Sequence, residues 1–145
     1  GAVHAFDRSL GADPKNAEAL YHQGLALDAL GMHHEAIEVF ARAAERDPEA
    51  ADTGYHMGLA LHTLGRPEEA VTALGRTLEL QAEAPDAWYY HGISLSALHR
   101  HTEALESFEK GLAVQGRDGR LWHGKGVALA ELDRNEEAAR ALGIR

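Results

Sequence analysis

Several residue types recur along this chain at one constant interval of 34 positions. Because unrelated residue types keep the same register, the sequence predicts an array of repeated units rather than a fold with one central core. Tyrosine keeps this interval at Tyr21, Tyr55 and Tyr89. The other positions that keep it hold glycine (Gly24, Gly58, Gly92, Gly126), alanine (Ala36, Ala70, Ala104, Ala138) and leucine (Leu27, Leu61, Leu95, Leu129 and Leu30, Leu64, Leu98, Leu132).

Each unit is predicted to contain two short helices. Small and apolar residues recur three and four positions apart over residues 20–30 and again over 36–44, which is the spacing of one helix face. Gly31 separates the two segments and is a suitable stop for the first. Asp47 and Pro48 end the second, because a proline disfavours helix at the residue before it.

The two helices of a unit are expected to fold back on each other about Gly31. Gly24 and Ala36 would then lie at one level, where their small size lets the helices approach closely. Neither helix is long enough to be stable alone in water, and one hairpin cannot bury both of its faces. Neighbouring hairpins must therefore stack, and the predicted fold class is all-α. Pro67 and Pro85 are expected near helix starts, and Asn135 is expected to be an N-cap.

A helix–turn–helix unit of this length resembles the tetratricopeptide repeat family. The third unit follows the family pattern almost throughout, and the fourth follows it in part. The residues that carry the resemblance are Trp88, Gly92, Ile93, Leu95, Ala104 and Phe108, and then Trp122, Gly126, Leu129 and Ala138. The resemblance implies an α-solenoid of antiparallel helix–turn–helix repeats that wind into a right-handed superhelix.

Some positions depart from the family pattern. Leu20 and Gly54 stand where a tryptophan is typical, and His99 replaces the glycine between the helices. Gly111 and Gly116 replace the later alanine and proline. These departures predict looser turns after residues 98 and 114.

The register divides the chain, a single array over 1–145, into uneven parts. Residues 1–16 are expected to form the second helix of a truncated unit. Complete units follow at 17–50, 51–84 and 85–118, and 119–145 is an incomplete unit. Because the chain begins with Gly1 and no methionine, it is expected to be a fragment or a processed piece.

No polar capping helix is visible at either end, although solenoid ends normally need one. A second hypothesis is therefore a self-assembling scaffold whose repeat ends stack into dimers or larger oligomers. The apolar residues at the two ends are Phe6, Leu10, Ala138, Leu142 and Ile144.

The leading functional hypothesis is a scaffold that binds a peptide or helix of a partner protein. The resemblance implies that the first helices of the units line a concave groove. By register, the predicted groove residues are Glu18, Tyr21, Leu25, Asp28, Asp52, Tyr55, Leu59, His62, Asp86, Tyr89, Ile93 and Ser96.

The tyrosines at 21, 55 and 89 have two interpretations. Each offers rigid apolar area and one hydroxyl, which suits the gripping of a peptide. They would equally serve to pack neighbouring first helices together. The acids beside them either favour a ligand with basic residues or form only a solvated rim.

Some family members bind the C-terminal carboxylate of a chaperone peptide with basic and amide side chains in this groove. The matching positions here hold Tyr21, Leu25, Leu59, Tyr89 and Ile93. We expect no carboxylate clamp of that type.

Composition argues against other classes of partner. With 14 basic and 23 acidic residues the net charge is −9, whereas nucleic acids and anionic membranes attract basic surfaces. No apolar run approaches the ~20 residues needed to span a bilayer, and no signal peptide is visible. A cytoplasmic location is expected.

No enzyme chemistry stands out. The chain has no cysteine and neither a phosphate-binding loop nor a Gly-x-Ser-x-Gly motif. Ten histidines, among them His99 and His101, raise the hypothesis of a metal site, yet no helical His-x3-His pair exists. We therefore expect neither a catalytic residue nor a metal or cofactor.

Overall fold

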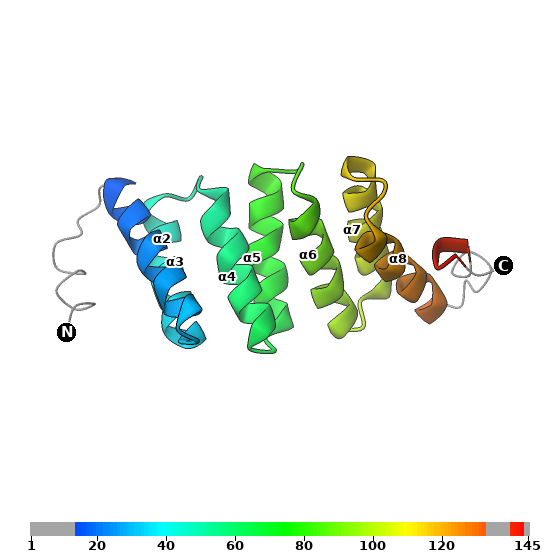
Figure 1. The fold of residues 1–145 in the computed structure, drawn as a ribbon, viewed down its shortest axis with the longest axis horizontal. Helices are drawn as coiled ribbons and strands as arrows, with labels where there is room; N and C mark the ends of the chain where they lie inside the picture. Colours follow the sequence, from blue (N-terminus) through cyan, green and yellow to red (C-terminus); the bar gives the residue numbers. More distant parts are fainter. Residues whose placement is uncertain (1–13, 133–139, 144–145) are drawn as a thin grey trace.

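The computed structural model describes residues 14–132 and 140–143, and within them the chain forms helices and turns without a strand (Figure 1). Consecutive helices pair as hairpins, which confirms the predicted all-α solenoid of helix–turn–helix repeats. The helices are α2 (Pro14–Ala29), α3 (His33–Arg46), α4 (Ala51–Thr63), α5 (Pro67–Leu80), α6 (Pro85–Ala97), α7 (His101–Val114) and α8 (Gly119–Glu131).

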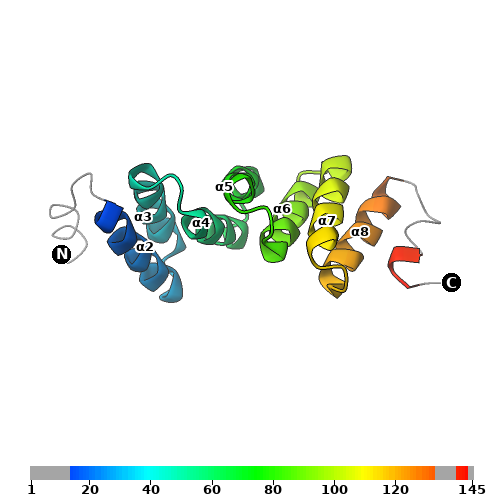
Figure 2. The same cartoon turned by 90° about the horizontal axis from the view of Figure 1, so that it is seen from above.

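The hairpins stack so that first and second helices form two layers. Figure 2 shows α2 and α4 on one side of the stack and α3 and α5 on the other. Within the described residues, Cα atoms of α2 and α4, of α4 and α6, and of α6 and α8 lie within 8 Å of one another, whereas those of successive second helices do not. The first helices are therefore closer together than the second helices, and the stack bends toward the first-helix layer.

The helix boundaries follow the predicted signals. Pro67 and Pro85 are the first residues of α5 and α6, where a missing N–H costs no helical hydrogen bond. The second helix α3 ends one residue before Asp47, as the following proline predicts. Gly31 follows α2 in the left-handed region with φ of +80°.

The turn after residue 98 is as tight as its counterparts, so the prediction of a looser turn is wrong. His99 adopts φ of +60°, the same left-handed region that Gly31 and Gly65 occupy. The backbone hydrogen bonds also match. The amide of His99 donates to Ser96 over 3.0 Å, and the amide of Gly65 donates to His62 over 3.0 Å. The turn therefore forms with histidine as it does with glycine, but the backbone of His99 is strained, because a side chain disfavours positive φ.

The turn after residue 114 is likewise closed. The amide of Gln115 donates to the carbonyl of Gly111 over 2.8 Å, as the amide of Gln81 does to Thr77 in the preceding unit over 2.8 Å. The indole N–H of Trp122 also donates to the carbonyl of Gly116 over 2.7 Å. The glycine at 116 therefore does not loosen the connection.

Gly24 makes room for an aromatic ring rather than for a close approach to Ala36. A Cβ atom at Gly24 would lie 2.5 Å from Cε1 of Phe40 in the second helix of the same unit. In the next unit Gly58 faces Leu74 in the same way, with a distance of 2.5 Å to Cγ. The repeated glycine is thus required by the large side chain across from it.

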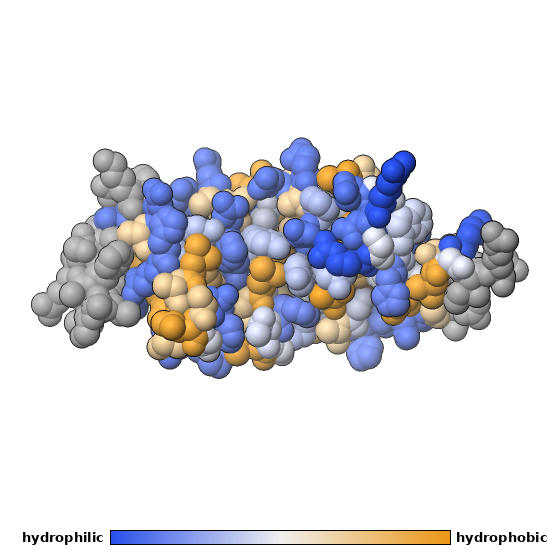
Figure 3. Space-filling view, in the orientation of Figure 1, coloured by the Kyte–Doolittle hydropathy of each residue, from blue (hydrophilic) through white to orange (hydrophobic). Residues whose placement is uncertain are grey.

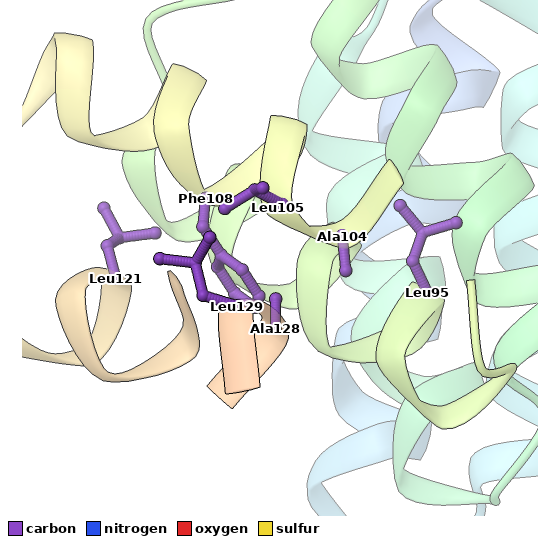
Figure 4. Close-up of a cluster of buried hydrophobic side chains, with 7 residues drawn as sticks. All are labelled: Leu95, Ala104, Leu105, Phe108, Leu121, Ala128 and Leu129. Atoms are coloured by element: carbon purple, nitrogen blue, oxygen red, sulfur yellow. The ribbon is translucent and has the colours of Figure 1, made fainter. Parts of the chain in front are cut away.

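The core runs through the stack as a series of clusters between hairpins. Figure 4 shows one cluster, in which α6, α7 and α8 contribute side chains to the same interior. Phe108 of α7 is buried there, and burial of such a side chain stabilises a fold by roughly 1.5–3 kcal/mol. The cluster consists of Leu95, Ala104, Leu105, Phe108, Leu121, Ala128 and Leu129.

Several predicted features lie outside the described residues. These are almost all of the truncated unit at 1–16, the N-cap at Asn135, and the apolar end residues Phe6, Leu10, Ala138 and Ile144. The predicted unit boundaries therefore stay predictions. In the described part of the chain, no helix has both the length and the apolar character needed to cross a membrane.

Candidate functional site

The candidate site is the exposed surface of α2, α4, α6 and α8, called here the first-helix face. Tyr21, Tyr55 and Tyr89 lie at equivalent positions of α2, α4 and α6, and each ring is half-buried. These three residues are called the tyrosine ladder. Figure 3 shows that hydrophilic and hydrophobic residues intermingle over the side of the molecule seen in Figure 1.

Each tyrosine of the ladder contacts the following unit. The ring centroid of Tyr21 lies 5.7 Å from that of His56, in an edge-on arrangement. The rings of Tyr55 and Tyr90 are 6.4 Å apart, again edge-on. The tyrosines thus pack against neighbouring first helices, and the half of each ring that stays exposed is the part available to a ligand.

The third tyrosine contacts a cation instead of a ring. The guanidinium carbon of Arg120, in α8, lies 4.7 Å from the centroid of the Tyr89 ring. One guanidinium nitrogen of Arg120 is also 2.5 Å from a carboxylate oxygen of Asp86. Asp118 is a second partner at 3.1 Å. The bonds to these two carboxylates raise the pKa of the Arg120 guanidinium.

The acids of the first-helix face lie near the tyrosines of the preceding unit. Burial raises the pKa of the Tyr21 phenol, and the negative charge of Asp52 raises it further. Burial also raises the pKa of Tyr55, with Asp86 adding to the effect and the positive Arg120 opposing it. Tyr21 and Tyr55 are therefore each affected by the acid one unit ahead.

The remaining predicted groove residues are spread along the same helices. His62 lies beside Tyr90, with ring centroids 5.7 Å apart. Asp28 is hydrogen-bonded to His33 at the start of the next helix. The other apolar and polar positions are half-buried on α2, α4 and α6, and they are Leu25, Leu59, Ile93 and Ser96.

Two hollows open along this set of residues. The first has a volume of about 560 Å³ and lies between the starts of α2 and α4, and its lining includes Glu18, Tyr21, His22, Asp47 and Asp52. The second, of about 220 Å³, lies between α6 and α8 and brings together the predicted Tyr89, Ile93 and Ser96 with Phe108, Arg120, His123, Gly124 and Val127.

Sequence reasoning missed the residues that the fourth unit adds. Arg120 stands in the same register as Glu18, Asp52 and Asp86, so the 34-residue interval would have found it. The predicted groove covers only the three complete units, whereas Arg120 lies in the incomplete one. Tyr90 and His56 were missed as groove neighbours because they follow the ladder position by one residue, and only packing brings them to the preceding tyrosine.

Several of the described histidines contact other side chains. His99 and His101 have ring centroids 5.8 Å apart. His91 is hydrogen-bonded to Ser107, with Nδ1 and Oγ 2.7 Å apart. Over the described residues, no three histidine or carboxylate side chains gather in a way that could hold a metal ion.

Comparison with known sequences decides the family. A tetratricopeptide repeat profile matches residues 55–113 and again 91–143, which together cover more than half of the chain. The chain belongs to the tetratricopeptide repeat family. Residues 1–77 match a second profile of this type, that of the anaphase-promoting complex, cyclosome, subunit 3. No curated protein matches the sequence.

Solved structures of MamA are similar to this chain. A crystal structure of MamA is 27% identical, covers 99% of this chain and 84% of its own, and superposes with a TM-score of 0.86. MamA 41-end from Desulfovibrio magneticus RS-1 is 20% identical over 91% of this chain and 73% of its own, with a TM-score of 0.80. At that lower identity the likeness concerns the fold alone.

Proposed function

We propose that this tetratricopeptide array is a protein-interaction scaffold that holds a peptide or helix of a partner on its first-helix face. The observation that carries the proposal is the tyrosine ladder. Three half-buried rings stand at equivalent positions on three consecutive first helices, on the side toward which the stack bends. A row of partly exposed tyrosines supplies contact area at low entropic cost, as binding sites require.

The charges and hollows around the ladder support the same function. Exposed acids at Glu18, Asp52 and Asp86 accompany the tyrosines. The hollow of about 560 Å³ beside Tyr21 could receive one side chain of a bound segment. The proposed partner is therefore a polypeptide with both apolar and basic residues.

The test is affinity capture of partner proteins from the source cells, with identification by mass spectrometry. The wild-type chain is compared with the double variant Tyr55→Ala/Tyr89→Ala. We expect a partner that the wild type captures and this variant loses, with circular dichroism confirming that the variant is folded.

A matched control lies on the second helices. Leu80 and Val114 are also one repeat apart and are 43% and 40% exposed. The double variant Leu80→Ala/Val114→Ala should capture the partner as the wild type does. Equal capture by all three proteins would contradict the first-helix face as the binding site.

Self-association through the repeat ends is the alternative function, and the same purified protein can be used to distinguish it from partner binding. Light scattering of the purified chain measures its mass over a range of concentrations. A mass that rises with concentration, and that the ladder variant leaves unchanged, would favour stacking of the ends. A constant monomeric mass would contradict self-association and would leave partner binding as the remaining proposal.

A further inference from the structure

Arg120 of α8 contacts the third unit on the first-helix face. Its guanidinium lies 4.7 Å from the Tyr89 ring centroid and 2.5 Å from Asp86, which stands one turn before that tyrosine on α6. A tyrosine ring and a carboxylate from one first helix thus contact a guanidinium that comes from the next, where Asp118 also pairs with it at 3.1 Å. This pair of residues is called the cradle.

The same cradle occurs in the two preceding units. Glu18 and Tyr21 form it on α2, and Asp52 and Tyr55 form it on α4, with the same spacing along the helix as Asp86 and Tyr89. The 34-residue register therefore places three cradles along the first-helix face. Only for the third cradle does the next unit supply an arginine at the corresponding position.

For each of the first two cradles, the residue that corresponds to Arg120 in the 34-residue register is an acid. Asp52 stands there for the α2 cradle and Asp86 for the α4 cradle. Burial raises the pKa of the Tyr21 and Tyr55 phenols, and the acid one unit ahead of each raises it further. Among the described residues, Asp52 forms an ion pair with no basic side chain. The α2 cradle thus combines a ring with two carboxylates, and among the described residues no arginine or lysine pairs with them. In the α4 cradle, by contrast, Asp86 is already paired with Arg120.

We propose that an arginine side chain of the bound partner segment occupies the α2 cradle, between Glu18, Tyr21 and Asp52, as Arg120 occupies the third. The hollow of about 560 Å³ lined by these three residues provides the space. This inference rests on the proposed function, because it names the chemistry of the partner at the same face.

Arginine fits this environment better than lysine. A guanidinium is planar, so it stacks on a tyrosine ring while its edge donates to carboxylates on either side. An ammonium group is a compact, strongly hydrated charge and cannot do both equally well. The third cradle shows both contacts in one side chain, with Arg120 over Tyr89 and beside Asp86.

The geometry can be tested without any partner. The variant Asp52→Arg supplies the first cradle with a guanidinium from the position that Arg120 holds in the third. We expect its melting temperature to exceed that of Asp52→Gln, although a cation is unfavourable in the first turn of α4. The advantage should disappear when Tyr21→Leu is added. An Asp52→Arg variant no more stable than Asp52→Gln would overturn the inference.

The binding test uses two short peptides as probes. One carries two arginines in an otherwise alanine–serine sequence, and in the other both arginines are replaced by citrulline, which has the same shape without the charge. Nuclear magnetic resonance follows the ring protons of Tyr21 and Tyr55 during titration at low salt. We expect binding of the arginine peptide, about tenfold weaker binding of the citrulline peptide, and loss of the preference in Asp52→Arg.

The control variant is Glu38→Arg, which makes the same charge change at an exposed site of the second helix α3 and should bind as the wild type does. If both peptides shifted the tyrosines equally, the face would bind peptides but the arginine inference would fail. If neither peptide shifted them, the inference would also fail, whereas the proposed function would still be decided by the capture of a partner.

Discussion

A Cβ atom at Gly92 would lie 2.5 Å from Cε1 of Phe108, so the glycine of α6 and the ring of α7 share one space. The same ring is equally close to Gly124 of α8, at 2.5 Å from a Cβ built there. Phe108 is 1% exposed. One buried ring thus fills the space between three helices, and both facing positions must lack a side chain.

Substitution of Gly92 should therefore damage the fold. Gly92→Leu is expected to lower the free energy of unfolding by about 3 kcal/mol or more, because the buried ring cannot move aside without overpacking the core. Gly92→Ala should cost about 1–2 kcal/mol, since the gain in helix propensity offsets part of the clash. Urea unfolding followed by circular dichroism measures both. A Gly92→Leu variant as stable as the wild type would contradict the packing.

Gly75 in α5 provides the matched control for Gly92. A Cβ atom there would meet only Nε2 of His91, at the ordinary contact distance of 3.7 Å. Gly75→Ala should therefore raise the free energy of unfolding by about 0.5–1 kcal/mol through helix propensity alone. Loss of stability in this variant would show that glycine is needed there for another reason.

His99 is expected to be a point of backbone strain that glycine relieves. It has φ of +60° in a turn where the two preceding units have Gly31 and Gly65. His99→Gly should raise the free energy of unfolding by about 0.5–1 kcal/mol. The reverse change, Gly65→Ala, should lower it by a similar amount, as a thermal melt of each variant would show. A loss of stability in His99→Gly would mean that the ring contact of His99 with His101 outweighs the strain.

Stability should fall as the pH falls below about 6.5, the ordinary pKa of histidine. Burial lowers the pKa of His91, and the positive charges of Arg100 and Lys110 lower it further, against an opposing effect of Glu103. Burial likewise lowers the pKa of His56. The unfolded chain then binds more protons than the folded chain in this range, so the stabilisation is complete above pH 6.5 and is lost on acidification.

The pH effect can be assigned to a residue by substitution. His91→Gln should be less stable than the wild type at neutral pH, because the hydrogen bond with Ser107 is disturbed. Its free energy of unfolding should, however, change less than that of the wild type between pH 7.5 and 5.5. Parallel pH profiles for the two proteins would show that His91 does not contribute.

The ion pair of Asp86 with Arg120 is expected to stabilise the stack only weakly. Their side chains are 57% and 46% exposed, so water and salt screen the attraction. A double-mutant cycle with Asp86→Asn and Arg120→Gln should give a coupling of less than about 1 kcal/mol at low salt, decreasing in 1 M sodium chloride. A coupling that did not respond to salt would indicate a contact shielded from solvent.

The repeat, the hairpins and most helix boundaries could be predicted because each depends on local information. The interval of 34 residues, the proline at the start of α5 and the glycine after α2 all act within one unit. The glycine positions were predicted, but their partner was not. Periodicity predicts that a small residue is needed at Gly24. The residue that requires it, Phe40, is known only once the facing helix is placed against α2.

The sequence by itself determined the helical repeat, the excess of acidic over basic residues and the ladder of Tyr21, Tyr55 and Tyr89. The tertiary structure decided what each ladder residue touches. Tyr21 lies against a histidine, Tyr55 against a tyrosine and Tyr89 beneath the guanidinium of Arg120, and all three contacts come from the following unit. The physical reason is that periodicity fixes the face on which a side chain lies, whereas stacking of one hairpin on the next determines its neighbour.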